Sequence, residues 1–81
     1  MEQFYVIEVQ RFADGTFAHN VFWEYDENLD TARLKAESKY HAVLSAAAIS
    51  SVKEHSAILF SSQGDPIMYQ CYVHPNVEAE E

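Results

Sequence analysis

The spacing of apolar residues in the first third of the chain predicts a β-hairpin. Apolar side chains recur with a period of two over residues 3–12 and again over residues 16–25. This alternation is typical of β-strands, because successive side chains point to opposite faces of a sheet. The dipeptide Asp14-Gly15 lies between the two segments. It favours a tight hairpin turn, since glycine readily adopts the positive φ that such turns require.

The period becomes helical from about residue 30 to residue 50. An apolar stripe recurs there every three or four residues, formed by Ala36, Tyr40, Val43, Leu44 and Ala47. Asn28 or Asp30 can accept hydrogen bonds from the free N–H groups of the first helical turn, so each is a candidate N-cap. A helix is therefore predicted directly after the first hairpin.

Residues 55–62 and 67–74 predict a second hairpin, joined by the turn Gln63-Gly64-Asp65-Pro66. The element order is then β-β-α-β-β. Two hairpins and one helix predict a single α+β domain over residues 1–75, with a four-stranded antiparallel sheet and the helix across one face. Residues 76–81 are predicted to form an acidic tail.

Both faces of the predicted sheet carry large apolar residues, and one helix can cover only one of them. The alternation does not decide which face this is. If the helix covers the face with Tyr5, Ile7 and Trp23, the residues left over are Phe4, Val6, Phe22, Met68 and Tyr72. Contiguous exposed apolar patches usually mark an interface. We therefore predict a homo-oligomer, formed by stacking of sheets or by pairing of edge strands.

Charge is segregated along the chain. The cationic residues of the segment 31–53 are Arg33, Lys35, Lys39 and Lys53. With Glu37 they give this segment a net charge of +3, whereas the rest carries one arginine, Arg11, against twelve carboxylates, and the whole chain has −8. An anion is expected to be attracted to the basic segment and repelled elsewhere. Such an acidic chain is not expected to bind DNA or RNA, which needs clustered lysines and arginines.

The basic segment suggests a site for a small phosphorylated ligand. The two glycines of the chain, Gly15 and Gly64, are accounted for by turns, so the chain has no glycine-rich phosphate loop and must use side chains. The candidates to pair phosphates are Arg33, Lys35, Lys39 and Arg11. The candidates to orient a base or sugar are Tyr40, His41 and Trp23, with Ser38 as a further hydrogen-bond donor. The alternative is that these residues only form the polar outer face that any helix needs.

No motif of this sequence indicates catalysis, a cofactor or a metal. The single cysteine, Cys71, has no disulfide partner in the chain, and we interpret it as a small buried hydrophobe. Glu37 and His41 have a spacing that metal-binding helices use, but Cys71 and His74 fall on opposite faces of a strand. We predict no enzymatic activity, no cofactor and no metal site.

The N-terminal segment lacks the features of a signal peptide. The longest apolar stretch is far shorter than the ~20 residues that a membrane-spanning helix needs. A soluble, cytoplasmic protein is therefore expected.

Three segments resemble a known group of proteins. They are YVIEVQRFADGTFAHNVF, AESKYHAVLSAAAISSV and HSAILFSSQGDPIMYQCYVH, and the resemblance covers nearly all of residues 4–74. The group consists of small proteins of unknown function found in prophages and phages of gut-type Firmicutes. It implies no activity and no catalytic residue, only a setting, a small accessory phage protein made in a bacterial cytoplasm. Small proteins in that setting often counter host defences, by binding a defence protein or by forming oligomers that sequester a nucleotide-derived immune signal.

Three functions remain open. In the first, a homo-oligomer sequesters a phosphorylated ligand at the basic segment. In the second, the acidic surface, with its cluster Glu24, Asp26 and Glu27, binds and inhibits a host defence protein directly. In the third, the chain is a structural or assembly accessory of the phage.

Overall fold

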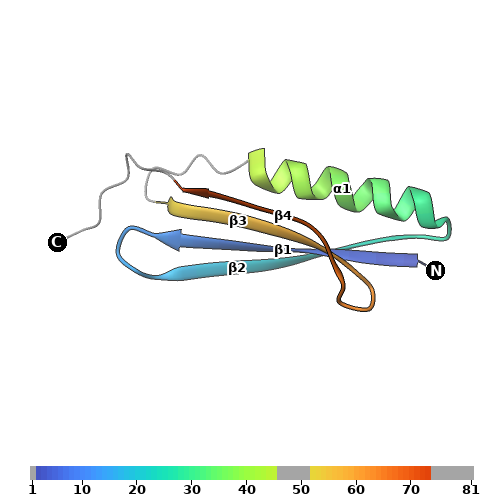
Figure 1. Ribbon diagram of the computed structural model, residues 1–81, viewed down its shortest axis with the longest axis horizontal. Coiled ribbons are helices and arrows are strands. Elements are labelled where there is room, and N and C mark those ends of the chain that lie inside the picture. Colours follow the sequence, from blue (N-terminus) through green and yellow to red (C-terminus); the bar gives the residue numbers. More distant parts are fainter. Residues whose placement is uncertain (1, 46–51, 74–81) are drawn as a thin grey trace.

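The computed structural model describes residues 2–45 and 52–73, which form four strands and one helix (Figure 1). In chain order these are β1 (Glu2–Phe12), β2 (Phe17–Asp26), α1 (Leu29–Ser45), β3 (Val52–Ser61) and β4 (Pro66–Val73). The predicted order β-β-α-β-β is confirmed. The predicted continuation of the helix over residues 46–50, including Ala47 of its stripe, lies outside the described residues. So do His74, at the end of the last predicted strand, and the predicted tail, residues 76–81.

The four strands form one antiparallel sheet in the order β2-β1-β3-β4. Each hairpin contributes one central and one edge strand, and the hairpins meet where β1 pairs with β3, for example at Ile7 opposite Ile58. The sheet lies on one side of the molecule and α1 on the other (Figure 1). The predicted α+β class, with one helix across a four-stranded antiparallel sheet, is confirmed.

Local hydrogen bonds fix the first turn and the start of the helix. Gly15 has a φ of +89°, and beside it Asp14 Oδ1 accepts hydrogen bonds from the N–H (2.9 Å) and hydroxyl (2.6 Å) of Thr16. Asn28 Oδ1 accepts the N–H of Thr31 at 3.0 Å. Asn28 is therefore the N-cap of α1, which decides between the two candidates.

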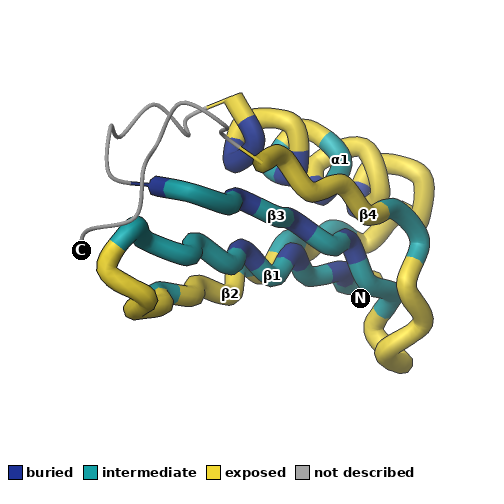
Figure 2. The backbone as a smooth tube through the Cα atoms, turned by 60° about the vertical axis from the view of Figure 1, so that its left-hand side comes forward, coloured by how far each residue is buried: buried dark blue, intermediate teal, exposed yellow. Residues whose placement is uncertain are grey.

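The helix packs across β1, β2 and β3. It covers the face that carries Phe4 and Val6, which we call the covered face. The buried apolar core is formed by Phe4, Val6, Ala32, Ala36, Tyr40, Val43, Leu44, Ala57 and Leu59, with Phe22, Ile67 and Met68 packed against it. Burial is accordingly concentrated in β1, β3 and the inner side of α1, while β2 and β4 are largely exposed (Figure 2).

The covered face also buries a polar pair. His55 Nε2 lies 2.7 Å from Glu8 Oε2, and Asn20 Nδ2 donates a hydrogen bond to the other carboxylate oxygen of Glu8 at 3.0 Å. Both members of the pair are buried. His55 Nδ1 has no hydrogen-bond partner among the described residues. The carboxylate is thus satisfied on both oxygens, as a buried polar group requires.

The opposite face of the sheet carries no element of the described chain, and we call it the open face. Its apolar members are Tyr5, Ile7, Val9, Phe17, Val21, Trp23, Tyr25, Ile58, Phe60, Tyr69, Cys71 and Val73. This arrangement decides which of the two apolar sets the helix covers. The set with Tyr5, Ile7 and Trp23 lies on the open face, and the set with Phe4, Val6 and Phe22 faces the helix. Cys71 is exposed on this face, so its interpretation as a buried hydrophobe is wrong.

Candidate functional site

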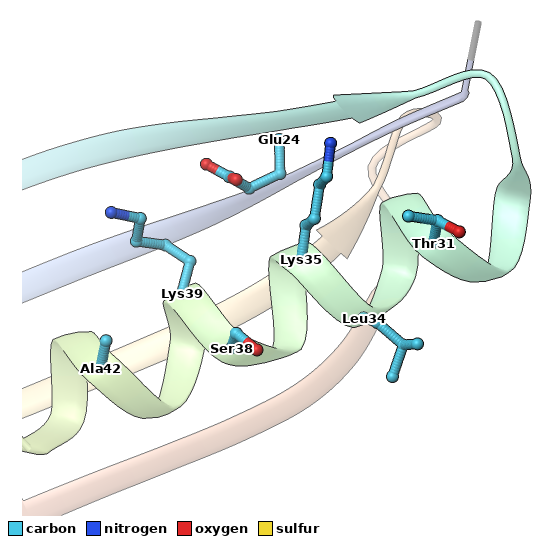
Figure 3. A pocket seen from close by; sticks show the side chains of 7 residues that line it. All are labelled: Glu24, Thr31, Leu34, Lys35, Ser38, Lys39 and Ala42. Atoms are coloured by element: carbon cyan, nitrogen blue, oxygen red, sulfur yellow. The ribbon is translucent and has the colours of Figure 1, made fainter.

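A groove of about 460 Å³, open to solvent, runs between α1 and β2. We call it the helix groove. Its lining residues are Glu24, Thr31, Leu34, Lys35, Ser38, Lys39 and Ala42. The spacing of three and four residues places the helical members on one flank of α1. Both lysine side chains project from the helix toward β2, with the Glu24 carboxylate between them (Figure 3). The helix groove therefore brings two cations, two hydroxyls and one carboxylate together.

The charge of Lys35 is already engaged by the end of β2. Lys35 Nζ lies 3.0 Å from Asp26 Oδ2 and donates a hydrogen bond to the carbonyl oxygen of Tyr25 at 3.2 Å. Asp26 also accepts the N–H of Asn28. That backbone hydrogen bond, followed by the one from Lys35, lowers the pKa of Asp26 below its ordinary value. Lys35 thus mainly links the helix to the end of β2 through this ion pair and hydrogen bond.

Lys39 has no such engagement. Its Nζ lies 5.2 Å from the centre of the Phe22 ring, within the range of a cation–π contact, and it takes part in no ion pair among the described residues. A second cavity of about 250 Å³ is lined by Lys39 together with Glu8, Phe22, Ala42 and Val43. Because Lys39 lines both cavities, it marks the point where the helix groove meets the buried carboxylate of Glu8.

Two predicted ligand residues of the helix do not line the helix groove. Arg33 Nε donates a hydrogen bond to Glu37 Oε2 at 3.0 Å, which forms the ion pair expected from their four-residue spacing. His41 is exposed one turn further along, with its ring centre 5.2 Å from that of Tyr40. Helical periodicity places Arg33 and His41 on the flank away from Lys35 and Lys39. They belong to a different surface of the helix.

Tyr40 is part of the core and not of a surface site. Its side chain is 2% exposed, and this burial raises the pKa of its hydroxyl above the ordinary value. No ligand in the helix groove can reach the Tyr40 ring unless the helix separates from the sheet. Tyr40 belongs to the apolar stripe, which is the other role predicted for it.

Arg11 and Trp23 lie on the open face, on the side of the sheet away from the helix. Arg11 Nη2 lies 2.6 Å from Glu54 Oε1. The hydrogen bond between them raises the pKa of Arg11 and lowers that of Glu54. The seven predicted residues therefore do not form one site. Only Lys35 and Lys39 come together.

Sequence reasoning did not assign four members of the helix groove to the ligand site, namely Glu24, Thr31, Leu34 and Ala42. Thr31 precedes Lys35 by four residues, so the helical period was a signal that could have found it. Glu24 alternates with Trp23 on β2 and shares the face of Phe22. Its place beside the helix became evident only with the knowledge of which face the helix covers.

Among residues 2–45 and 52–73, no three His, Cys, Asp or Glu side chains are grouped so that they can hold a metal ion. The candidate pair Glu37 and His41 has no third ligand there, and Glu37 is bound by Arg33. No helix in the described part of the chain is long and apolar enough to cross a membrane.

Comparison with known proteins gave no relative. No protein-family model matches the chain, and neither a curated protein nor a solved structure matches it.

Proposed function

We propose that this protein is a non-enzymatic binding protein of the phage accessory type. It acts as a homo-oligomer in the cytoplasm of the host cell and holds a small phosphorylated, nucleotide-derived ligand in the helix groove. By sequestering that ligand it counters a host defence. The observation that supports this proposal is Lys39, a cation at the groove without an ion-pair partner among the described residues.

The rest of the helix groove suits the same class of ligand. Its volume of about 460 Å³ lies within the range of about 300–1,000 Å³ that is common for small-molecule sites. Thr31 and Ser38 supply hydroxyl groups for a phosphate or a sugar, and Leu34 and Ala42 supply apolar surface for a base. Lysine binds phosphate as a point charge, so no planar arginine fork is required.

Glu24 favours a second candidate function. Its carboxylate lies between the two lysines (Figure 3) and opposes the entry of an anion. Together with the net charge of −8, it supports an inhibitor that binds a basic surface of a host defence protein directly. In that case the cluster Glu24, Asp26 and Glu27 is the contact surface, and Lys35 only holds Asp26 in place.

Calorimetric titration with a cyclic dinucleotide and with ADP-ribose tests the ligand. We expect Lys39→Ala to weaken binding by about 10-fold or more, because a hydrogen bond to a charged group contributes roughly 1.5–3 kcal/mol. Lys53→Ala is the matched control, since it removes the same charge from β3 and not from the helix groove. If neither probe binds, these ligands are excluded; if Lys39→Ala binds as the unchanged protein does, the helix groove is not the site.

Glu24→Gln separates the two functions. If the helix groove holds an anion, this substitution removes a repelling charge and strengthens binding. If the acidic cluster contacts a protein, the same substitution weakens capture of that protein from host lysate, and Lys39→Ala leaves capture unchanged. The two proposals thus predict opposite effects of one isosteric change.

A further inference from the structure

Large apolar residues lie side by side over much of the open face. At one end, the ring of Tyr5 lies between those of Trp23 (4.7 Å between centroids) and Phe60 (4.9 Å). The next row across the sheet is Val21, Ile7, Ile58 and Tyr69. On this face Phe17, Tyr69 and Val73 are more than half exposed, Phe17 by 65% and Tyr69 by 64%. An exposed, contiguous apolar surface of this kind indicates a contact surface.

The charges of this face restrict what can cover it. At its regularly alternating positions the charged side chains are Arg11 and Glu54, and these neutralise each other at 2.6 Å. The face is thus neutral, although the chain carries −8. Nucleic acid requires several free cations, and the one arginine here is already paired. A strongly charged protein partner gains no electrostatic attraction from such a neutral surface. A second acidic copy can approach it without repulsion at the contact.

The dimensions of the face also favour another sheet. Strands of about ten residues at about 3.3 Å each, spaced about 4.8 Å apart, give a surface of roughly 33 by 19 Å. A single helix is about 10 Å across and covers about half of this width. Two stacked faces bury roughly 600 Å² of footprint on each copy, or about 1,200 Å² in total, which reaches the lower limit of specific interfaces.

We infer that the open face binds the open face of a second copy, so that two sheets stack with the helices outside. A two-fold axis between β1 and β3, parallel to the strands, places β1 over the partner's β3. Ile7 then meets the partner's Ile58, and Arg11 meets the partner's Glu54. Charge complementarity is thus satisfied twice by symmetry, and the stacked sheets form an aligned sandwich. This interface presupposes the proposed homo-oligomer and is independent of the proposed ligand.

Sedimentation velocity of the full chain over a range of concentrations tests the interface. Val21→Glu and Tyr69→Glu each place a charge on an exposed edge-strand position of the open face. We expect each to raise the dissociation constant of the dimer at least about 100-fold, because the new carboxylate would be buried against the partner without a cation to pair with. Leu34→Glu is the matched control. Leu34 is 63% exposed on the helix, away from the open face, and its variant should assemble as the unchanged chain does.

The outcomes distinguish the proposed homo-oligomer from the proposed open-face interface. A wild-type chain that is monomeric at every concentration overturns both the homo-oligomer and this interface. A wild-type oligomer that Val21→Glu and Tyr69→Glu leave intact overturns the interface alone. Circular dichroism establishes that the variants are folded. If the glutamate variants do not fold, Tyr69→Ser and Leu34→Ser make the same comparison with a smaller expected shift.

Discussion

The two faces of the sheet both carry large apolar residues, yet within residues 2–45 and 52–73 only one of them is buried. On the covered face, Val6 and Leu59 are completely buried beneath the helix. On the open face, Trp23 and Tyr69 remain 44% and 64% exposed. Apolar content therefore does not identify the core of a small domain. The two faces differ in whether another element packs against them, and one helix can cover only one face.

Small residues explain how the helix fits the covered face. Ala32 and Ala36 on the helix and Ala57 on β3 are completely buried. Their small side chains allow α1 to approach the sheet closely, so that Tyr40 and Leu59 fill the remaining space. The open face instead carries large side chains, among them the rings of Tyr5, Trp23 and Phe60, which do not allow so close an approach of a helix.

The largest difference in stability between substitutions on the two faces should be seen at two adjacent residues of β3. Leu59 is fully buried on the covered face, and Ile58 is half-buried on the open face. We expect Leu59→Ala to lower the free energy of unfolding of the monomer by about 3–4 kcal/mol, because it leaves a cavity. Ile58→Ala should cost less than about 1.5 kcal/mol. Urea unfolding at low protein concentration measures both, and equal losses would contradict the distinction between the faces.

The buried polar pair should give the next largest effect. His55→Ala leaves the Glu8 carboxylate buried with one of its two partners missing. We expect a loss of about 2–3 kcal/mol in the free energy of unfolding, since an unsatisfied buried polar group is costly. His19→Ala is the control because His19 is exposed on the open face, and its loss should stay below about 0.5 kcal/mol. A His55→Ala variant as stable as His19→Ala would show that the pair does not hold the covered face.

Reversing one charge on the open face should weaken self-association by a smaller amount. Arg11→Glu brings two carboxylates together both within the chain and across the proposed interface, so the dissociation constant of the dimer should rise about 10-fold. The double variant Arg11→Glu with Glu54→Arg restores both pairs and should restore the affinity. Sedimentation velocity measures this as well. If the double variant associates as weakly as the single one, Arg11 and Glu54 do not face each other across the two copies.

The smallest predicted effect concerns pH. The hydrogen bond from Arg11 lowers the pKa of Glu54, so this carboxylate contributes stability above its ordinary pKa, and the contribution is lost as the pH falls through the lowered value. The free energy of unfolding should therefore fall in acid, and Glu54→Gln should make that fall shallower. Urea unfolding between neutral pH and pH ~3 measures the difference. An identical slope in both proteins would show that the pair adds nothing to stability.

Local patterns in the sequence predicted the elements well. Alternation predicted the two strands of the first hairpin, and Asn28 was one of two candidate caps. These features depend on neighbours within a few residues along the chain. They require no knowledge of the tertiary structure.

The candidate site was harder to predict because it depends on contacts between distant segments. Trp23 was predicted to share a site with Lys39. Lys39 lies over Phe22, whereas Trp23, the next residue of β2, points to the opposite face of the sheet. This separation follows only once it is known which face the helix covers. Tyr40 had two possible roles, and burial against the sheet decided for the core. Charge segregation drew attention to the helix, but it did not reveal that Glu24 lies between the lysines.

The fluorescence of Trp23 tests the central claim most directly, since it is the only tryptophan of the chain and lies on the open face. Acrylamide quenching is measured for the wild-type chain and for Tyr69→Glu, at concentrations from nanomolar to hundred-micromolar. We predict that Trp23 becomes shielded and its emission shifts to the blue as the wild-type concentration rises, while in Tyr69→Glu it stays accessible throughout. Equal quenching of both proteins at every concentration would contradict the claim that the open face is where two copies meet.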